Sequence, residues 1–244
     1  MSAFLPSGES LAFVSCVSDL DVLQRCLLQS PCIAEGHWPL QAFFNAHSAA
    51  DAFNRALAAT PDGTWLVWVH QDVLLPKGWD TQFLKGLAEA RQKFPHTVVA
   101  GVYGVSGWGV NAQRAGHVLD RGSLLQEPSP LPCLVDSLDE LLFAVRKECG
   151  LQLDPQLGFD FYATDIVLQA QARGLQGVVV DAYCEHWSNT PTGLVIPASM
   201  AKRIRTSGAA FENKWASQLP VQTSWLTVER PGDVERFLAQ FETR

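Results

Sequence analysis

The 244-residue sequence lacks the marks of export and of a membrane span. Residues 1–6 have no basic start leading into a long apolar segment, and no later apolar run approaches the roughly 20 residues that cross a bilayer. We therefore expect a protein without an integral membrane segment. Its expected location is the cytoplasm, with a peripheral position at the membrane as the alternative.

Basic residues are in short supply, since 18 Lys and Arg face 25 Asp and Glu and give a formal net charge of −7. This balance provides no general attraction for nucleic acid, so no nucleic-acid partner is expected. Any phosphate that the protein binds must be neutralised by local groups.

The six cysteines contain no Cys-x-x-Cys pair, which argues against a zinc knuckle or a redox motif. Internal repeats and low-complexity tracts are also missing. Apolar residues make up 47% of the chain and suffice for the core of one main domain.

Strand and helix patterns alternate along the chain and predict an α/β fold with a mainly parallel sheet flanked by helices. Residues 104–131 have weak periodicity, which predicts a long binding loop, a lid or a disordered insertion. We expect residues 1–190 to form the main domain and residues 191–244 a C-terminal appendage or lid packed on it. Strands are expected at residues 11–17, 42–44, 65–69, 97–103, 141–145 and 178–180, and helices after Asp19 and at residues 49–59, 79–94 and 162–173, with one more reaching Trp215.

The apolar strand at residues 65–69 stops abruptly at His70-Gln71-Asp72. Ligands of open α/β sheets bind in the crevice outside the carboxyl ends of the strands, so Asp72 is a candidate functional carboxylate. The competing interpretation is that Asp72 caps a turn, which is common after strands.

Three further polar groups interrupt apolar patterns, and in such a sheet they are expected to meet Asp72 in one crevice. Carboxylates with one imidazole suit Mg²⁺ or Mn²⁺ better than zinc and leave one acid for proton transfer. The groups are Asp136 with Asp139 and Glu140, Asp160 with Asp165, and Glu185 with His186. Their structural alternatives are, in the same order, a solvated turn, an acid in the first turn of a helix, and a half-buried histidine.

This order of motifs resembles family 2 type glycosyltransferases with the GT-A fold, which use nucleotide-sugar donors. His70-Gln71-Asp72 takes the place of that family's Asp-x-Asp metal motif, with His replacing the first Asp. The segment at residues 158–168 is similar to the family's acidic segment, with Asp165 at its last Asp and Tyr162-Ala163 in place of its Glu-Asp pair.

The resemblance implies metal-assisted transfer of a sugar from a UDP- or GDP-linked donor to the hydroxyl of a glycan or lipid-linked acceptor, with inversion. It implies Mn²⁺ or Mg²⁺ held by Asp72 and His186, with His70 as a further candidate ligand. Asp165 is the leading catalytic base, and Asp139, Glu140 and Asp160 are its substitutes. A role in lipopolysaccharide or other surface polysaccharide synthesis is implied by the family alone.

The chemistry of sugar transfer adds expectations about the donor and acceptor contacts. Lys202 to Arg205 could close over the diphosphate as a lid, with Lys214-Trp215 adding a cation and an aromatic wall. Trp79 and Trp108 are candidates for stacking on a sugar. Donor contacts are expected from Ser15, Val17, Ser18, Asn54, Arg55, Gln71 and Asp72, and acceptor contacts from Trp108, Asp160 and Tyr162.

Two other functions stay open. A nucleotidyltransferase would need a Gly-rich, basic segment after the first strand, whereas Ser18-Asp19-Leu20-Asp21 is acidic. The second alternative is a catalytically silent sugar-nucleotide binding module, which the missing Glu-Asp pair at Tyr162-Ala163 supports.

Overall fold

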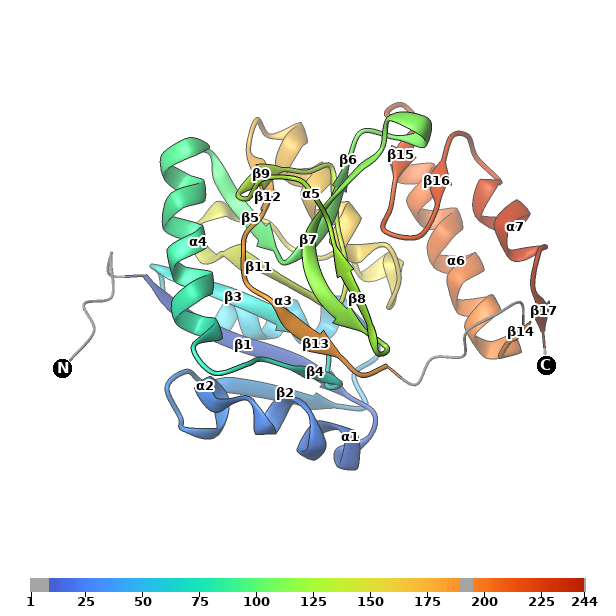
Figure 1. Cartoon of the computed structure of the whole chain (residues 1–244). Helices are drawn as coiled ribbons and strands as arrows, with labels where there is room; N and C mark the ends of the chain where they lie inside the picture. The colour runs from blue at the N-terminus through green and yellow to red at the C-terminus, as the bar shows by residue number, and fades with distance from the viewer. Residues whose placement is uncertain (1–8, 189–194, 244) are drawn as a thin grey trace.

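A seven-stranded sheet forms the centre of the computed structural model, which describes residues 9–188 and 195–243 (Figure 1). The strand order is β2-β1-β3-β11-β5-β12-β9, and all strands except β11 and β9 run in one direction. The expected α/β class with a mainly parallel sheet is therefore confirmed. The strands are β1 (Ser10–Val17), β2 (Leu40–Phe44), β3 (Thr64–Val69), β5 (Thr97–Gly101), β9 (Cys133–Leu134), β11 (Leu142–Arg146) and β12 (Gln176–Val179).

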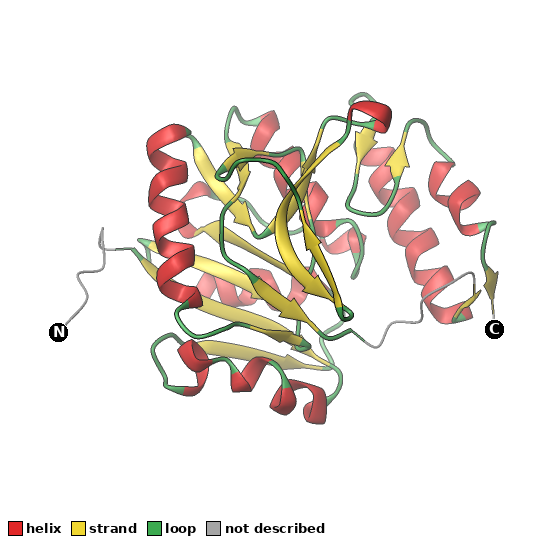
Figure 2. Cartoon of the chain, viewed as in Figure 1, coloured by secondary structure: helices red, strands yellow, loops and turns green. Residues whose placement is uncertain are grey.

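Helices cover both faces of this sheet (Figure 2), which explains why the central strand β3 is buried along its whole length. Every residue of β3 is buried, with Trp65 and Val67 in the core on one face and Leu66 and Trp68 in the core on the other. The helices on the Trp65 face are α1 (Leu20–Arg25), α2 (Pro31–Ala34) and α4 (Trp79–Lys93), and those on the Trp68 face are α3 (Ala49–Ala59) and α5 (Tyr162–Ala172).

Two predicted helix starts are confirmed by their capping geometry. The Asp19 side chain accepts hydrogen bonds from the backbone N–H groups of Asp21 and Val22, and Ser48 accepts one from Asp51 N. Such caps satisfy backbone donors that have no partner inside the helix. Helix positions were therefore readable from short local motifs.

The prediction of an irregular loop at residues 104–131 is wrong, because this segment contributes most of a second sheet. That sheet has the order β10-β6-β7-β13-β4, with β8 paired to β7. Arg121 and Gly122 both have positive φ, 50° and 80°, as a tight β7–β8 hairpin turn requires. The strands are β4 (Val73–Leu74), β6 (Tyr103–Ser106), β7 (Gln113–Asp120), β8 (Ser123–Gln126), β10 (Ser137–Leu138) and β13 (Cys184–His186), and a short helix η2 (Gly109–Asn111) joins β6 to β7.

Gly116 allows β7 to lie close to the backbone that links β5 to β6. Its φ is 102°, and a Cβ at this position would lie 2.1 Å from Val102 O. Only glycine fits there, since any larger residue would meet backbone.

The C-terminal elements enclose a third apolar cluster that includes Phe161 and Leu168 from the α5 region. The predicted boundary between residues 190 and 191 lies outside the described residues, so we keep this division as a proposal. Among the helices that the structure describes, none is long and apolar enough to cross a membrane. The C-terminal elements are β14 (Val195–Ile196), α6 (Ala198–Lys214), β15 (Val221–Gln222), β16 (Thr227–Val228), α7 (Asp233–Leu238) and β17 (Glu242–Thr243).

Candidate functional site

Two adjoining cavities lie at the carboxyl ends of the parallel strands. The smaller has a volume of about 580 Å³ and the larger about 840 Å³. Both are lined by His70, Phe159, His186, Ser188 and Arg203, so they form one continuous cleft. This is the position at which the strand-end argument placed a ligand site.

His70, Asp72 and His186 form a cluster able to hold a metal ion between the two cavities. One potential ligand atom from each lies within 4.8 Å of the others. The pairing of β13 with β4 sets His186 opposite Val73, and Trp187 N donates to Asp72 O at 2.9 Å. Sheet pairing therefore brings together residues more than a hundred positions apart.

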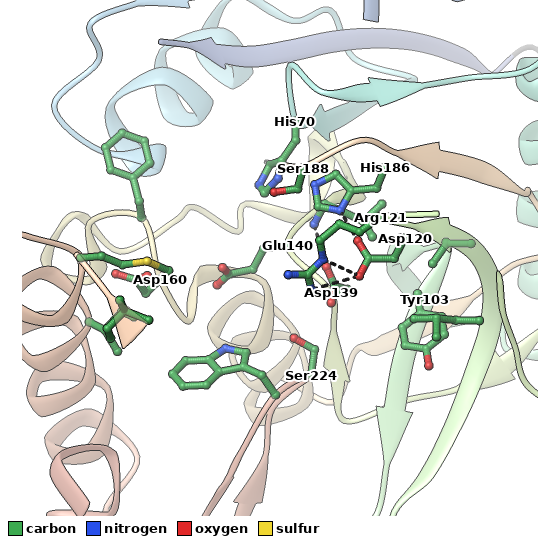
Figure 3. A pocket seen from close by; sticks show the side chains of 18 of the residues that line it. His70, Tyr103, Asp120, Arg121, Asp139, Glu140, Asp160, His186, Ser188 and Ser224 are labelled. Atoms are coloured by element: carbon green, nitrogen blue, oxygen red, sulfur yellow. Dashed lines mark hydrogen bonds and ion pairs between the residues drawn. The ribbon is translucent and has the colours of Figure 1, made fainter. Parts of the chain in front are cut away.

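Two carboxylates hold the His186 imidazole between them, and Figure 3 shows one of them, Asp120. Nδ1 lies 2.8 Å from Asp120 Oδ1, and Nε2 lies 3.3 Å from Asp72 Oδ1. Burial opposes a charge on the ring, but the two carboxylates outweigh it and raise the pKa of His186 to about 9. Asp120 thus fixes the orientation of the ring and directs Nε2 toward Asp72.

His70 has the opposite electrostatic character. Burial, helped by the charge of His186, lowers the pKa of His70 to about 4, so the ring is neutral near neutral pH. Its Nε2 lies 3.0 Å from the Tyr162 hydroxyl. A neutral imidazole is the form that coordinates a metal.

The donor set fits a divalent transition-metal ion. It combines two imidazoles with one carboxylate, and His186 Nε2 is buried and lies 3.3 Å from Asp72 Oδ1 without a well-aligned hydrogen bond among the described residues. Mg²⁺ prefers oxygen ligands, whereas imidazole suits transition metals. Of the two predicted ions, Mn²⁺ therefore matches these residues better than Mg²⁺.

The smaller cavity is lined by the ends of the first three strands. Val17 and Ser18 follow β1, Asn45 and Ala46 follow β2, and Gln71 follows β3. Of the predicted donor contacts, Val17, Ser18, Gln71 and Asp72 thus lie at one cavity. Tyr162, which was predicted to contact the acceptor, lies at this smaller cavity too.

Gln71 holds the loop after β1 in place. Its Oε1 accepts from Ser18 N at 2.9 Å and Asp19 N at 3.0 Å, while Nε2 donates to Ser18 Oγ at 2.9 Å. The Gln71 amide is therefore occupied by protein contacts and shapes the cavity floor.

Five carboxyl groups line the larger cavity: Asp120, Glu127, Asp139, Glu140 and Asp160. The last three were predicted as substitutes for the base, and they differ in their contacts. Asp139 accepts from Leu141 N at 3.0 Å, and Asp160 receives two hydrogen bonds of 3.0 Å from Arg203. Glu140 Oε1 is buried and has no hydrogen-bond partner among the described residues. Burial, with the nearby charges of Asp160 and Asp139, holds the pKa of Glu140 well above its usual range.

Asp165, the leading base from the sequence, lies outside the cleft, and this prediction is wrong. Its side chain is 0% exposed, pairs with Lys214 Nζ at 2.8 Å and accepts from Trp215 Nε1 at 2.8 Å. Gln169 Nε2 donates to it at 2.7 Å. Lys214 and Trp215 therefore join the end of α6 to α5, and they do not form the expected cation and aromatic wall of the cleft.

Asp165→Asn is expected to leave turnover unchanged and to lower stability by about 1–3 kcal/mol, because a buried charge-assisted hydrogen-bond network is weakened. Activity assays together with thermal unfolding of the two proteins measure both effects. A large loss of turnover at unchanged stability would return Asp165 to the catalytic machinery.

Three predicted donor contacts also lie elsewhere. Asn54 exchanges two hydrogen bonds of 2.9 Å with the backbone of Leu153 and so ties α3 to the segment before α5. Arg55 is exposed and lies over the Phe43 ring, with its Cζ 5.0 Å from the ring centroid. Ser15 is fully buried and lines neither cavity.

The two tryptophans predicted to stack on a sugar do not line the cleft either. Trp79 is buried in the core, where its ring stacks on Phe83 with centroids 4.7 Å apart. Trp108 is 46% exposed and begins the turn between β6 and β7. Within the basic Lys202 to Arg205 cluster, Arg203 lines both cavities, whereas Arg205 pairs with Glu235 at the surface.

Asp120 is the most important site residue that the sequence did not identify. It ends β7 in the pattern Val118-Leu119-Asp120, just before the Arg121-Gly122 turn. This is the same succession of apolar strand and acid that drew attention to Asp72. Recognising a strand inside residues 104–131 would have been enough to find it.

Asp120→Asn is expected to weaken Mn²⁺ binding by about 10- to 100-fold, because a carboxylate that orients a ligating imidazole is lost. Calorimetric titration with Mn²⁺ measures this effect. Asp181→Asn is a suitable control, since Asp181 is exposed and absent from both cavity linings. Equal affinities of the Asp120 variant and the wild type would show that His186 needs no such support.

Comparisons with known proteins give distant similarities. No family model matches the chain. A protein of Fuscovulum blasticum described as ATP synthase subunits region ORF 6 is 29% identical over 160 residues, which cover 63% of this chain and 61% of that protein. The chain thus matches about three fifths of the length of this relative.

Among solved structures, GalNAc-T7 with UDP, GalNAc and Mn²⁺ has a TM-score of 0.48 at 12% identity, covering 86% of this chain and 50% of that chain. S. aureus TarS 1–349 in complex with UDP-GlcNAc has a TM-score of 0.47 at 12% identity, covering 96% and 71% of the two chains. These similarities are too low to assign a function, so any assignment has to rest on the chemistry of the cleft.

Proposed function

We propose that this protein is a metal-dependent glycosyltransferase of the GT-A type that moves a sugar from a nucleoside diphosphate to an acceptor hydroxyl. The observation that carries the proposal is the placement of His70, Asp72 and His186 between two connected cavities. One cavity lies at the strand ends, where nucleotides bind in α/β sheets, and the other contains a carboxyl group with one unpaired oxygen, that of Glu140.

The nucleoside diphosphate, UDP or GDP, would occupy the smaller cavity. Val17 and Ser18 would contact the nucleoside, and His70, Asp72 and His186 would hold the metal. When bound, a divalent metal supplies neutralising charge for the leaving diphosphate. Arg203 borders both cavities and would provide a further cation, in keeping with a lid role for residues 191–244.

Glu140 is the carboxylate best placed to act as the base. Asp139 is engaged in a turn and Asp160 is held by Arg203, whereas Glu140 Oε1 is unpaired. In the proposed inverting step the acceptor oxygen bonds to the anomeric carbon, and the bond to the diphosphate breaks. The hydroxyl proton passes to Glu140, whose raised pKa makes it a stronger proton acceptor than an ordinary glutamate.

Nucleotide binding and donor cleavage test the proposal together. Titration calorimetry with UDP and GDP, each with and without Mn²⁺, is expected to show binding that Mn²⁺ strengthens. Incubation with a panel of nucleotide sugars is then expected to release the nucleoside diphosphate. Binding without release would favour the silent binding module, and release of pyrophosphate from a nucleoside triphosphate would favour the nucleotidyltransferase.

Absence of nucleotide binding under all these conditions would contradict both the transferase and the binding module. A cytoplasmic role at the membrane in the synthesis of lipopolysaccharide or another surface polysaccharide is part of the same proposal. It depends on the chemistry of the acceptor.

A further inference from the structure

The wall that the C-terminal elements contribute to the larger cavity is mostly apolar, with Arg203 and Ser224 as its polar members. It combines aliphatic side chains from the β14–α6 region with aromatic ones from the region of α7. Trp225 and Phe237 have ring centroids 5.2 Å apart, and Phe237 and Phe241 have centroids 5.0 Å apart, so these rings form a continuous row. The residues of this apolar wall are Ile196, Met200, Ile204, Trp225, Phe237 and Phe241.

The opposite part of the same cavity is polar and charged. His70, Glu140 and His186 lie on this side in Figure 3, and Glu140 carries the unpaired carboxyl oxygen. Asp160 is held by Arg203 of α6, the helix that supplies part of the apolar wall. The larger cavity is therefore amphipathic, with its chemistry divided between two sides. A ligand that fills it needs the same division.

A ligand made only of sugar fits this cavity poorly. Each sugar hydroxyl buried against an aliphatic wall would lose hydrogen bonds to water without a replacement, at a cost in free energy. A hydrocarbon chain loses no such bonds and gains from leaving water. The apolar wall thus discriminates against a purely polar acceptor.

The second sheet adds two further apolar side chains to the lining of the larger cavity. Val118 of β7 is paired with Leu125 of β8, and both line the cavity. Leu125 is 36% exposed, which places a partly solvent-accessible apolar side chain at the cavity surface. A chain lying on the wall would therefore find apolar contact there as well.

We propose that the acceptor is amphipathic, with its reacting hydroxyl beside Glu140 and a hydrocarbon chain lying along the apolar wall. This inference rests on the proposed glycosyltransferase function and decides between the glycan and the lipid-linked acceptor in favour of the lipid-linked one. The C-terminal elements then act as the part of the protein that selects the acceptor.

Alkyl glucosides of increasing chain length, each kept below its micelle-forming concentration, test the inference by calorimetry without donor or metal. Each fully buried methylene is worth about a fourfold gain in affinity, so the hexyl compound is expected to bind at least about tenfold more tightly than the methyl compound. Equal affinity across the series would overturn the proposal.

Two neighbouring leucines provide a matched pair of variants. Leu125 lines the cavity, whereas Leu124 is 57% exposed, points to the other face of β8 and is absent from the lining. Leu125→Gln is expected to reduce the chain-length gain about threefold or more, and Leu124→Gln to leave it intact. Met200→Gln tests the inner part of the wall in the same way.

Equal effects of Leu124→Gln and Leu125→Gln would contradict the placement of the hydrocarbon chain.

The UDP and GDP titrations distinguish a failure of the glycosyltransferase proposal from a failure of the amphipathic-acceptor proposal. Chain-length-dependent binding without any nucleotide binding would preserve the apolar subsite and refute the transferase. Nucleotide binding with no chain-length dependence would preserve the transferase and refute the amphipathic acceptor.

Discussion

Asp72→Asn is expected to abolish most of the Mn²⁺-dependent gain in nucleotide affinity. The substitution removes the only carboxylate of the candidate metal cluster and keeps the size of the side chain. Loss of a residue that merely orients a ligand costs about 10- to 100-fold in metal affinity, so loss of a direct ligand should cost about 100-fold or more. Calorimetric titrations with Mn²⁺ alone, and with UDP in its presence, measure the change.

Asp62→Asn is the matched control for this experiment. Asp62 is an exposed acid in the turn before β3, the strand that Asp72 follows, and it is absent from both cavity linings. Its replacement is expected to leave both titrations unchanged. If Asp72→Asn bound Mn²⁺ as tightly as the wild type, the His70, Asp72 and His186 cluster would not be the metal site.

Glu140→Gln is expected to reduce turnover by about 10²- to 10⁴-fold while nucleotide affinity stays unchanged. Glutamine keeps the shape of the side chain but cannot take up the proton of the acceptor hydroxyl. Steady-state kinetics and UDP titration of the same preparation separate the two effects. Asp139→Asn is the comparison variant, and a larger loss there than in Glu140→Gln would move the base to Asp139.

The pH dependence offers a second test of Glu140. A base works in its deprotonated form, so activity should rise with pH through a pKa well above that of an ordinary glutamate. The raised pKa also means that the folded protein holds this proton more tightly than the unfolded chain. The free energy of unfolding should therefore fall as pH rises past the ordinary glutamate pKa.

Glu140→Gln also removes this fall in the free energy of unfolding with rising pH, because glutamine does not titrate. We expect the variant to be more stable than the wild type at neutral and mildly basic pH, where Glu140 would have to be buried with its charge. Thermal unfolding at several pH values measures the difference. A variant that loses both activity and stability would point to a structural role for Glu140.

Local sequence patterns predicted the parts of the fold that depend on short-range interactions. The uninterrupted apolar run of β3 predicted a strand buried on both faces, and Ser48 marked the first turn of α3. These signals lie within a few residues of the elements they define. The weak periodicity of residues 104–131 concealed the strand β7. This strand pairs with β6 and β8 nearby in the sequence and with β13 about 66 positions away.

The candidate site was predictable to the extent that it depends on strand ends. His70, Asp72 and His186 were expected in one crevice because strands of a parallel sheet end at the same edge. The structure brings them together, with potential ligand atoms within 4.8 Å. Their role as metal ligands stays a proposal that the Asp72→Asn titration tests.

The sequence by itself determined the α/β class, the helix starts and the edge of the sheet at which polar residues gather, because all of these follow from local propensity and hydrophobic periodicity. Only the tertiary structure decided that Asp165 is buried against Lys214 and that Asp120 supports His186. The physical reason is that burial and charge pairing depend on which distant elements come into contact. Those contacts leave no pattern within a single stretch of sequence.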